Sequence, residues 1–144
     1  MRDVVVCHCE ACREATGGPW FASAARRQDL VVEDDTALTW ERAGVSEHEA
    51  SRGRCHTCGT TVFWDAPGRE TVSFAVSTLA DASGLEVAGH IWVGEDDHAG
   101  PTALASDANA VAALASARAP RYSHGLPPSV VVPWKAPGSA DTTR

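Results

Sequence analysis

The five cysteines of the chain lie in two short clusters, and this spacing limits what the chain can fold into more than any other feature. The first cluster contains Cys7, Cys9 and Cys12, and the second contains Cys55 and Cys58. A disulfide framework in a small secreted domain would spread an even number of cysteines along the chain. Cys-x-Cys and Cys-x-x-Cys spacings instead bring thiolates together around one ion. The sequence therefore predicts that all five cysteines bind metal, with Zn²⁺ as the ion.

Two arrangements of these ligands agree with the spacing. In one, Cys7 and Cys9 join Cys55 and Cys58 in a closed four-thiolate site, and Cys12 is spare. In the other, Cys7, Cys9 and Cys12 hold an ion with an open fourth position, which is the arrangement of a catalytic zinc site. Cys55 and Cys58 then supply only half of a second site. Spacing alone does not choose between a closed structural site and an open catalytic one.

The second cluster has the form of a zinc knuckle. Gly59 follows Cys58 directly, and a glycine relieves the tight turn around the metal. A thioredoxin-like redox pair would instead open a helix within a βαβ unit. Residues 60–64 are rich in β-branched and aromatic side chains and predict a strand at this point, which disfavours the redox alternative.

Charge and hydrophobicity exclude several classes of protein. The chain has 144 residues and a formal net charge of −7, from 19 acidic and 12 basic residues. The basic residues are scattered and form no stripe that would displace counterions from phosphates, so we expect no nucleic-acid partner. No apolar run approaches the ~20 residues that span a bilayer, and the N-terminus lacks the apolar core of a secretory signal. We therefore expect a cytoplasmic protein with no membrane partner.

Short strand-like segments dominate the chain and predict a mainly β fold. They are rich in β-branched and aromatic residues and are separated by Gly, Pro and polar turns. The Ala-rich segment 107–118, with Asp107 as its N-cap, predicts a short C-terminal helix, and residues 136–144 are expected to be disordered. The expected strands are residues 4–6, 20–25, 29–33, 38–42, 60–64, 71–79 and 85–93, with a weaker one at 46–51 and an edge strand at 129–134.

The two cysteine motifs and their surroundings resemble the glutathione-dependent formaldehyde-activating enzyme family, which includes centromere protein V. The resemblance covers roughly residues 3 to 93, and Pro120-Arg121-Tyr122 is similar to the closing segment of the family. The residues that carry it are Cys7-His8-Cys9-x-x-Cys12-Arg13, Thr16-Gly17, Cys55-His56-Thr57-Cys58-Gly59-Thr60, Phe63 and Gly89-His90-Ile91-Trp92-Val93.

The resemblance implies an Mss4-like fold of short antiparallel strands around zinc-binding cysteine clusters. It implies that Cys7, Cys9 and Cys12 hold a catalytic zinc, and that Cys55 and Cys58 supply half of a structural zinc site. The implied activity is that of a carbon–sulfur lyase, S-(hydroxymethyl)glutathione synthase, which joins glutathione to formaldehyde. A small thiol such as glutathione and a small aldehyde are therefore the expected substrates.

The start of the chain departs from the family. Members place the other half of the structural zinc site in a Cys-x-Cys before their first hairpin, whereas Met1 lies only six residues before Cys7. We expect either a start codon placed too late or a variant without its structural zinc. The expected organisation is a zinc-binding domain at residues 1–125, truncated at its N-terminus, and a C-terminal tail at residues 126–144.

A non-catalytic function is the alternative: an Mss4-like zinc module that binds a protein partner. An exposed apolar patch beside a closed four-thiolate site would favour the module. A three-thiolate zinc that solvent can reach in a pocket would favour the enzyme. The sequence indicates no oligomeric state.

The sequence also suggests orientations and contacts for several polar side chains near the clusters. His8 and His56 are expected to point away from the metal, because they alternate with ligand cysteines. His90 is expected to be half-buried and hydrogen-bonded. Arg13 can pair with a glutathione carboxylate through its planar fork, or with a surface acid. The indole and phenyl rings of Trp20, Phe21, Trp64 and Trp92 are expected in the core or in a pocket wall.

Overall fold

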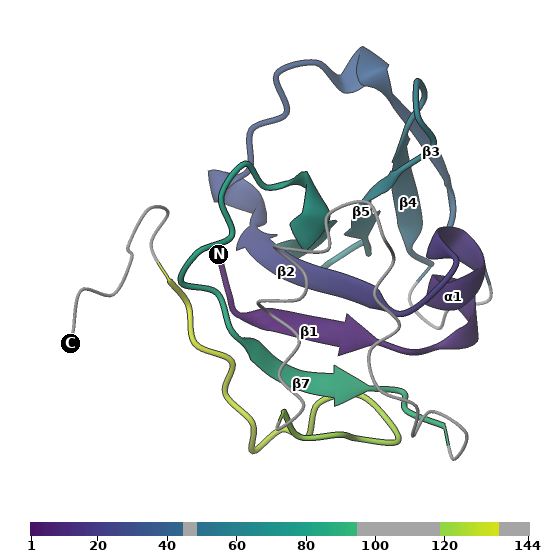
Figure 1. Ribbon diagram of the computed structural model, residues 1–144. Coiled ribbons are helices and arrows are strands. Elements are labelled where there is room, and N and C mark those ends of the chain that lie inside the picture. The colour runs from purple at the N-terminus through teal and green to yellow at the C-terminus, as the bar shows by residue number, and fades with distance from the viewer. Residues whose placement is uncertain (45–48, 95–118, 136–144) are drawn as a thin grey trace.

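A computed structural model describes residues 1–44, 49–94 and 119–135, which form one seven-stranded sheet with a short helix on one face (Figure 1). The sheet order is β3-β4-β5-β6-β2-β1-β7. In chain order the elements are β1 (Val4–Cys7), α1 (Glu10–Thr16), β2 (Trp20–Arg26), β3 (Leu38–Arg42), β4 (Ser51–Cys55), β5 (Thr61–Asp65), β6 (Thr71–Ala75) and β7 (Val87–Ile91), with 3₁₀ turns at Arg27–Asp29, Asp35–Ala37 and Val76–Thr78.

The pairing of the strands confirms the mainly β prediction and corrects one detail of it. Neighbours from β3 to β1 pair antiparallel, as expected. The edge strand β7 instead pairs parallel with β1, from Val4 opposite Val87 to Cys7 opposite Ile91. A parallel pair needs a long connection between its strands, and here β2 to β6 supply it.

Several predicted strands agree with the structure and one is wrong. The segments at 4–6, 20–25, 38–42 and 60–64 form strands, and those at 71–79 and 85–93 contain shorter ones. Residues 29–33 form no strand, because this segment pairs with no other strand and the Val31 side chain remains 80% exposed. Only a bridge between Arg2 and Trp134 forms at 129–134. The predicted helix at 107–118, the predicted disorder at 136–144 and part of the weak strand at 46–51 lie outside the described residues.

Helix α1 begins directly at the first cysteine cluster. Cys9 is its N-cap, with an extended backbone (φ −62°, ψ 154°), and its sulfur accepts a hydrogen bond from the backbone N–H of Cys12. At the other end, Gly17 adopts a left-handed conformation (φ 79°) and its N–H donates to the carbonyl of Arg13 at 2.7 Å. Left-handed geometry favours glycine, and such a residue ends many helices. The helix is therefore fixed at both ends by its own sequence.

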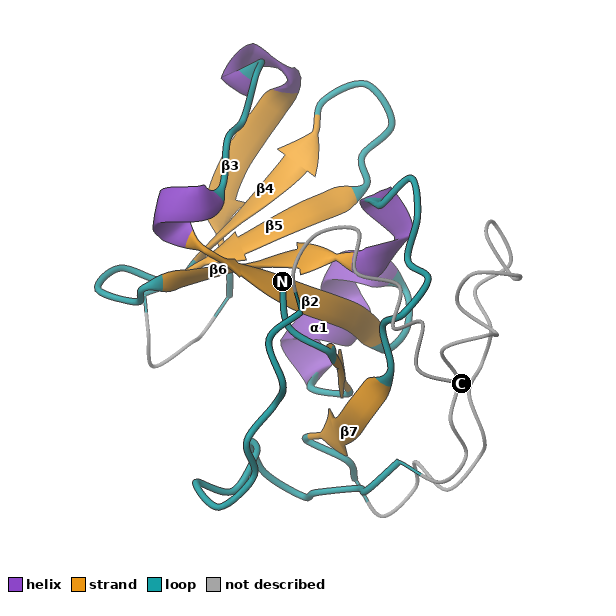
Figure 2. Ribbon diagram, turned by 90° about the vertical axis from the view of Figure 1, so that its left-hand side faces the viewer, coloured by secondary structure: helices purple, strands orange, loops and turns teal. Residues whose placement is uncertain are grey.

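Alternation along β1 and β2 places apolar side chains on both faces of the sheet. One face carries Val4, Val6 and Phe21, which pack with the cluster of Val76, Leu85, Val87 and Ala119. The other face carries Trp20 and Ala22, which pack with Cys12 of α1. Figure 2 shows α1 close to β2. Cys7 lies opposite Trp20 in the strand register, so it belongs to this second face. The sheet thus presents the first cysteine cluster to the helix.

Residues 119–135 run along β7 and return to the start of β1 (Figure 1). The backbone N–H of His90 donates to the carbonyl of Pro120, and the N–H of Asp3 donates to the carbonyl of Pro133. The ammonium of Lys135 lies 2.8 Å from the carboxylate of Asp3. The segment therefore packs on the sheet on both sides of residue 125, and the domain boundary at that residue stays a prediction.

Candidate metal centre

The first cysteine cluster converges because a strand ends where a helix begins. Cys7 is the last residue of β1, Cys9 caps α1, and Cys12 lies in the first turns of α1. The sharp turn that such convergence needs is the start of a helix, which the sequence analysis did not predict. As a result the three sulfur atoms lie within 4.8 Å of one another. We call Cys7, Cys9 and Cys12 the cysteine triplet.

The donor set of the triplet fits a zinc ion. Zinc–sulfur bonds of about 2.3 Å at tetrahedral angles place ligand sulfurs roughly 3.8 Å apart. A spread of no more than 4.8 Å is close to this value, so only small side-chain movements are needed. Cys12 is buried, whereas Cys7 and Cys9 are half-buried, which leaves part of the triplet open to solvent. Three sulfurs with one open side match a site that keeps a coordination position for a substrate.

Crowding of the three sulfurs perturbs their protonation. Hydrogen bonds from Cys12 and then Cys7 lower the pKa of Cys9 to about 2. Hydrogen bonds to Cys12 and Cys9, followed by burial, raise the pKa of Cys7. The hydrogen bonds among the three sulfurs therefore hold the thiol protons of the metal-free triplet in a shared network. A dication that replaces those protons would satisfy all three sulfurs, because the ligands of zinc are thiolates.

A buried arginine contacts the triplet from β4. Arg52 is only 4% exposed, and its Nη2 donates to the Sγ of Cys12 at 3.5 Å. Its guanidinium carbon lies 5.7 Å from the centre of the Trp20 ring. No sequence pattern points to Arg52, because its place opposite Trp64 depends on the pairing of β4 with β5.

His8 and His90 form a buried pair on the far side of the triplet backbone. The Nε2 of His8 lies 2.9 Å from the Nδ1 of His90, and the carbonyl of His8 accepts a hydrogen bond from the Nε of Arg13. Burial, followed by the charges of Arg121 and Arg13, lowers the pKa of His8. His90 is 6% exposed, so it is more buried than expected, and it has the predicted hydrogen bond.

The second cysteine cluster forms the turn between β4 and β5. The N–H of Gly59 donates to the carbonyl of Cys55, and the N–H of Cys55 donates to the carbonyl of Thr60. Gly59 has a positive φ of 75°, as a tight knuckle requires. A strand follows the turn, which agrees with a knuckle and not with a thioredoxin-like pair. Among the described residues, the triplet is the group with metal-ligand geometry, and it does not include Cys55 or Cys58.

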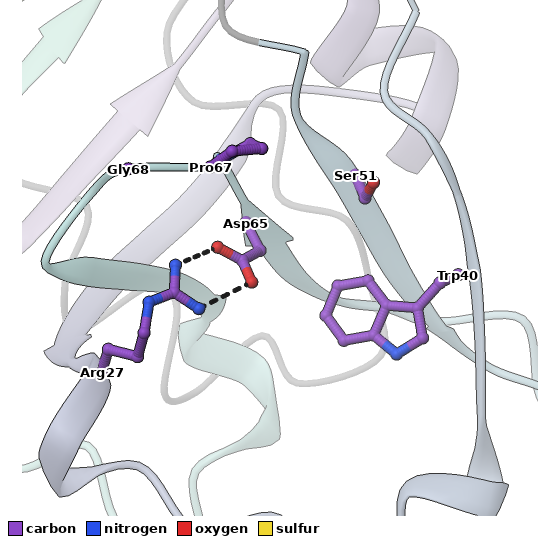
Figure 3. Close-up of a pocket in the computed structure, with 6 residues that line it drawn as sticks. All are labelled: Arg27, Trp40, Ser51, Asp65, Pro67 and Gly68. Atoms are coloured by element: carbon purple, nitrogen blue, oxygen red, sulfur yellow. Dashed lines mark hydrogen bonds and ion pairs between the residues drawn. The ribbon is translucent and has the colours of Figure 1, made fainter.

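A shallow cavity of about 330 Å³ lies elsewhere on the sheet (Figure 3). It is lined by Arg27, Trp40, Ser51, Asp65, Pro67 and Gly68. The guanidinium of Arg27 forms two hydrogen bonds with the carboxylate of Asp65, and both side chains are partly exposed. Because its one charged pair is mutually satisfied and it contains no cysteine, we place the candidate site at the triplet and not in this cavity.

Comparison with known sequences finds a family for this chain. The sequence model of one protein family, described as "Glutathione-dependent formaldehyde-activating enzyme", matches residues 2–95. The chain belongs to this family. The matched region contains both cysteine clusters, α1 and all seven strands of the sheet. No curated protein matches the chain closely enough to serve as a named relative.

Family membership confirms the resemblance seen in the sequence and gives the chain its chemical context. The description of the family points to glutathione-dependent activation of formaldehyde, with a thiol and an aldehyde as substrates. The triplet lies near the start of the matched region and forms a cluster that can bind a metal ion. None of the helices that the structure describes is long and apolar enough to cross a membrane.

Proposed function

We propose that this chain is a zinc-dependent carbon–sulfur lyase-type enzyme that joins a small thiol, such as glutathione, to formaldehyde or another small aldehyde. The observation that carries the proposal is the convergence of Cys7, Cys9 and Cys12 to within 4.8 Å, inside the region that matches the family. We assign these three residues as the ligands of the catalytic zinc.

The proposed reaction makes one carbon–sulfur bond. The sulfur of the thiol attacks the carbonyl carbon, the electron pair of the C=O double bond moves to the oxygen, and the proton lost by the thiol is taken up by that oxygen. The product is an S-hydroxymethyl thioether (a hemithioacetal), and no oxidant or reductant is needed. The reverse reaction breaks the same bond, which is why the activity is classed with the lyases.

Zinc bound at the triplet supplies a Lewis acid that favours the deprotonated thiol and polarises a carbonyl oxygen. The chain itself orients this chemistry. Cys12 is buried beside Trp20, so one ligand is held rigidly in the core, while Cys7 and Cys9 are half-buried at its margin. Trp64 packs partly buried on the same cluster. These rings form an apolar wall on the inner side of the triplet, so substrates reach it from the solvent side.

We further propose that Cys55 and Cys58 hold half of a structural zinc site, as the resemblance implies. The knuckle geometry of their turn supports this assignment. The non-catalytic alternative depends on a closed site formed by Cys7, Cys9, Cys55 and Cys58. The described residues contain no such group of four, so we favour the enzyme. A cytoplasmic location remains a prediction from the sequence.

Zinc content and catalysis, measured together, test the proposal. We would measure zinc per chain and the rate of exchange between ¹³C-formaldehyde and its glutathione adduct by NMR, for the wild-type protein, Cys12→Ser and Cys58→Ser. We expect Cys12→Ser to lose the zinc of the triplet and the acceleration over the uncatalysed exchange, and Cys58→Ser to keep both. If Cys12→Ser retains full zinc and Cys58→Ser loses it, the site is closed and structural, and the enzyme proposal fails.

A further inference from the structure

Arg52 is a buried cation, and no carboxylate forms an ion pair with it among the residues that the structure describes. Its side chain comes from β4 and reaches the inner side of the triplet, where Nη2 donates to Cys12 Sγ at 3.5 Å. Its Nη1 is also buried and has no hydrogen-bond partner within the described part of the chain. The other contact of the guanidinium is the face of Trp20. A cation–π contact compensates only part of the hydration that a buried guanidinium loses.

The next arginine on β4, Arg54, differs from Arg52 because its charge is paired with a carboxylate. Arg54 forms an ion pair with Glu41, donates to the backbone carbonyl of Ala15 in α1 and remains partly exposed. Arg13, next to Cys12 in sequence, is exposed and donates to the backbone carbonyl of His8. Of the charged side chains that the structure describes, Arg52 is the one hydrogen-bonded to a sulfur of the triplet.

The net charge of a metal–thiolate centre would explain why Arg52 is buried beside the triplet. Three thiolates and one divalent ion carry a net charge of −1, and burial of that charge is as unfavourable as burial of the arginine alone. A guanidinium in hydrogen-bond contact with one of the thiolates neutralises the pair. Without the ion, the thiol protons on the triplet reduce the negative charge that faces the arginine. The buried cation therefore fits the fully deprotonated, metal-bound triplet better than the metal-free one.

We propose that Arg52 is the counter-charge of the metal–thiolate centre, a positioning residue that raises the affinity of the triplet for a divalent ion. The proposal rests on the proposed function, since it requires a metal at Cys7, Cys9 and Cys12. It goes further by assigning a charged residue from a strand 40 residues away to the metal centre. It also predicts that Arg52 stabilises the metal-bound protein more than it stabilises the metal-free protein.

The test compares Arg52→Met, Arg52→Lys and the control Arg54→Gln in the full chain. Affinity for Zn²⁺ is measured by chelator competition, and Co²⁺ binding is followed through its thiolate charge-transfer absorption. The thermal midpoint is measured for each metal-free protein. We expect Arg52→Met to weaken metal binding at least about tenfold, because charges in contact at low exposure interact strongly even when screened. Arg52→Lys should restore most of the affinity, and Arg54→Gln should bind metal as the wild type does.

The metal-free midpoint separates a charge role from a packing role. As a counter-charge, Arg52 contributes more to metal binding than to the stability of the metal-free protein, so Arg52→Met weakens metal binding while the metal-free midpoint falls little. If Arg52 only packs on Trp20, Arg52→Met lowers the metal-free midpoint and leaves the metal affinity of the folded protein unchanged, and the inference is wrong. It is equally wrong if lysine restores nothing. Failure of the wild-type triplet to bind metal would instead overturn the proposed function, and this inference with it.

Discussion

Replacing Lys135 with methionine would remove the charge that faces a buried carboxylate at the start of the sheet. Asp3 is 4% exposed, and the ammonium of Lys135 lies 2.8 Å from its Oδ1. The same ammonium donates to the carbonyl of Gly84 at 2.6 Å. Lys135→Met keeps the length and the apolar part of the side chain, so the perturbation is largely one of charge. It tests whether residues 126–135 belong to the folded domain.

The expected loss of stability depends on how exposed the side chains of Lys135 and Asp3 are. Removing one partner of a fully buried pair costs about 3–5 kcal/mol, because the other charge stays buried and unpaired. The Lys135 side chain is 27% exposed, and the N–H of Glu86 still donates to Asp3 Oδ1 in the variant. Both features reduce the cost, and we expect the free energy of unfolding to fall by about 2 kcal/mol. For a chain of this length the unfolding entropy is about 0.3 kcal/mol/K, so the thermal midpoint should drop by roughly 6 °C.

Urea unfolding followed by tryptophan fluorescence, together with thermal unfolding, would measure this change. Lys135→Arg is the matched control, since it keeps the charge, and it should lose less than about 1 kcal/mol. In the double variant with Asp3→Asn the two losses should not add, because the buried charge that Lys135 compensates is gone. A midpoint unchanged in Lys135→Met, or losses that add fully in the double variant, would show that the C-terminal segment contributes no stability through this pair.

Three further changes probe the sheet and the metal centre. Gly89→Ala would place a Cβ 3.1 Å from the Tyr122 ring and 3.3 Å from the carbonyl oxygen of Pro120, so we expect a loss of about 1–3 kcal/mol in urea unfolding. Val6→Ala should cost about 2–3 kcal/mol by the same assay, since Val6 is 1% exposed and its methyl groups would leave a cavity, while zinc affinity of the folded protein changes little. The protein should be more stable with free zinc at one hundred times its Kd than after a chelator has removed the metal, and the free energy of unfolding should differ by up to about 2.7 kcal/mol. Calorimetry in the two conditions would measure this difference, and Cys12→Ser should abolish it.

The cysteine spacing predicted the triplet as a cluster, but not how the backbone forms it. Cys7 and Cys12 are five positions apart, and only a helix that starts at Cys9 brings their sulfurs together. A helix of seven residues, Glu10–Thr16, is too short to show a 3.6-residue period, and its N-cap is a cysteine, which is not among the usual capping residues. Local pattern therefore predicted the cluster of cysteines without the element that orients them.

The remaining features of the fold could not be predicted from local sequence, because they depend on which strands pair with one another. Val31 and Val32 have the composition of a strand, yet no other strand pairs with them, so tertiary context overrides their propensity. The parallel pairing of β7 with β1 joins residues more than 80 positions apart, which no local pattern specifies. The burial of Arg52 likewise depends on the register of β4 and on α1 covering that face. An arginine in a strand is otherwise expected on the surface.

The position of the triplet within the chain has a consequence for folding. All three sulfurs come from six consecutive residues, so closing the loop around an ion has a small entropic cost even before the sheet forms. An unfolded chain that meets zinc can thus already chelate it weakly, and metal stabilises the fold only by the difference between the two affinities. If Arg52 is the counter-charge proposed above, it supplies part of that difference, because it approaches Cys12 only when β4 is in place. The unfolded chain would then bind the metal weakly, and the folded chain would bind it tightly once β4 has packed beside the triplet. Tight metal binding would therefore indicate that folding is complete.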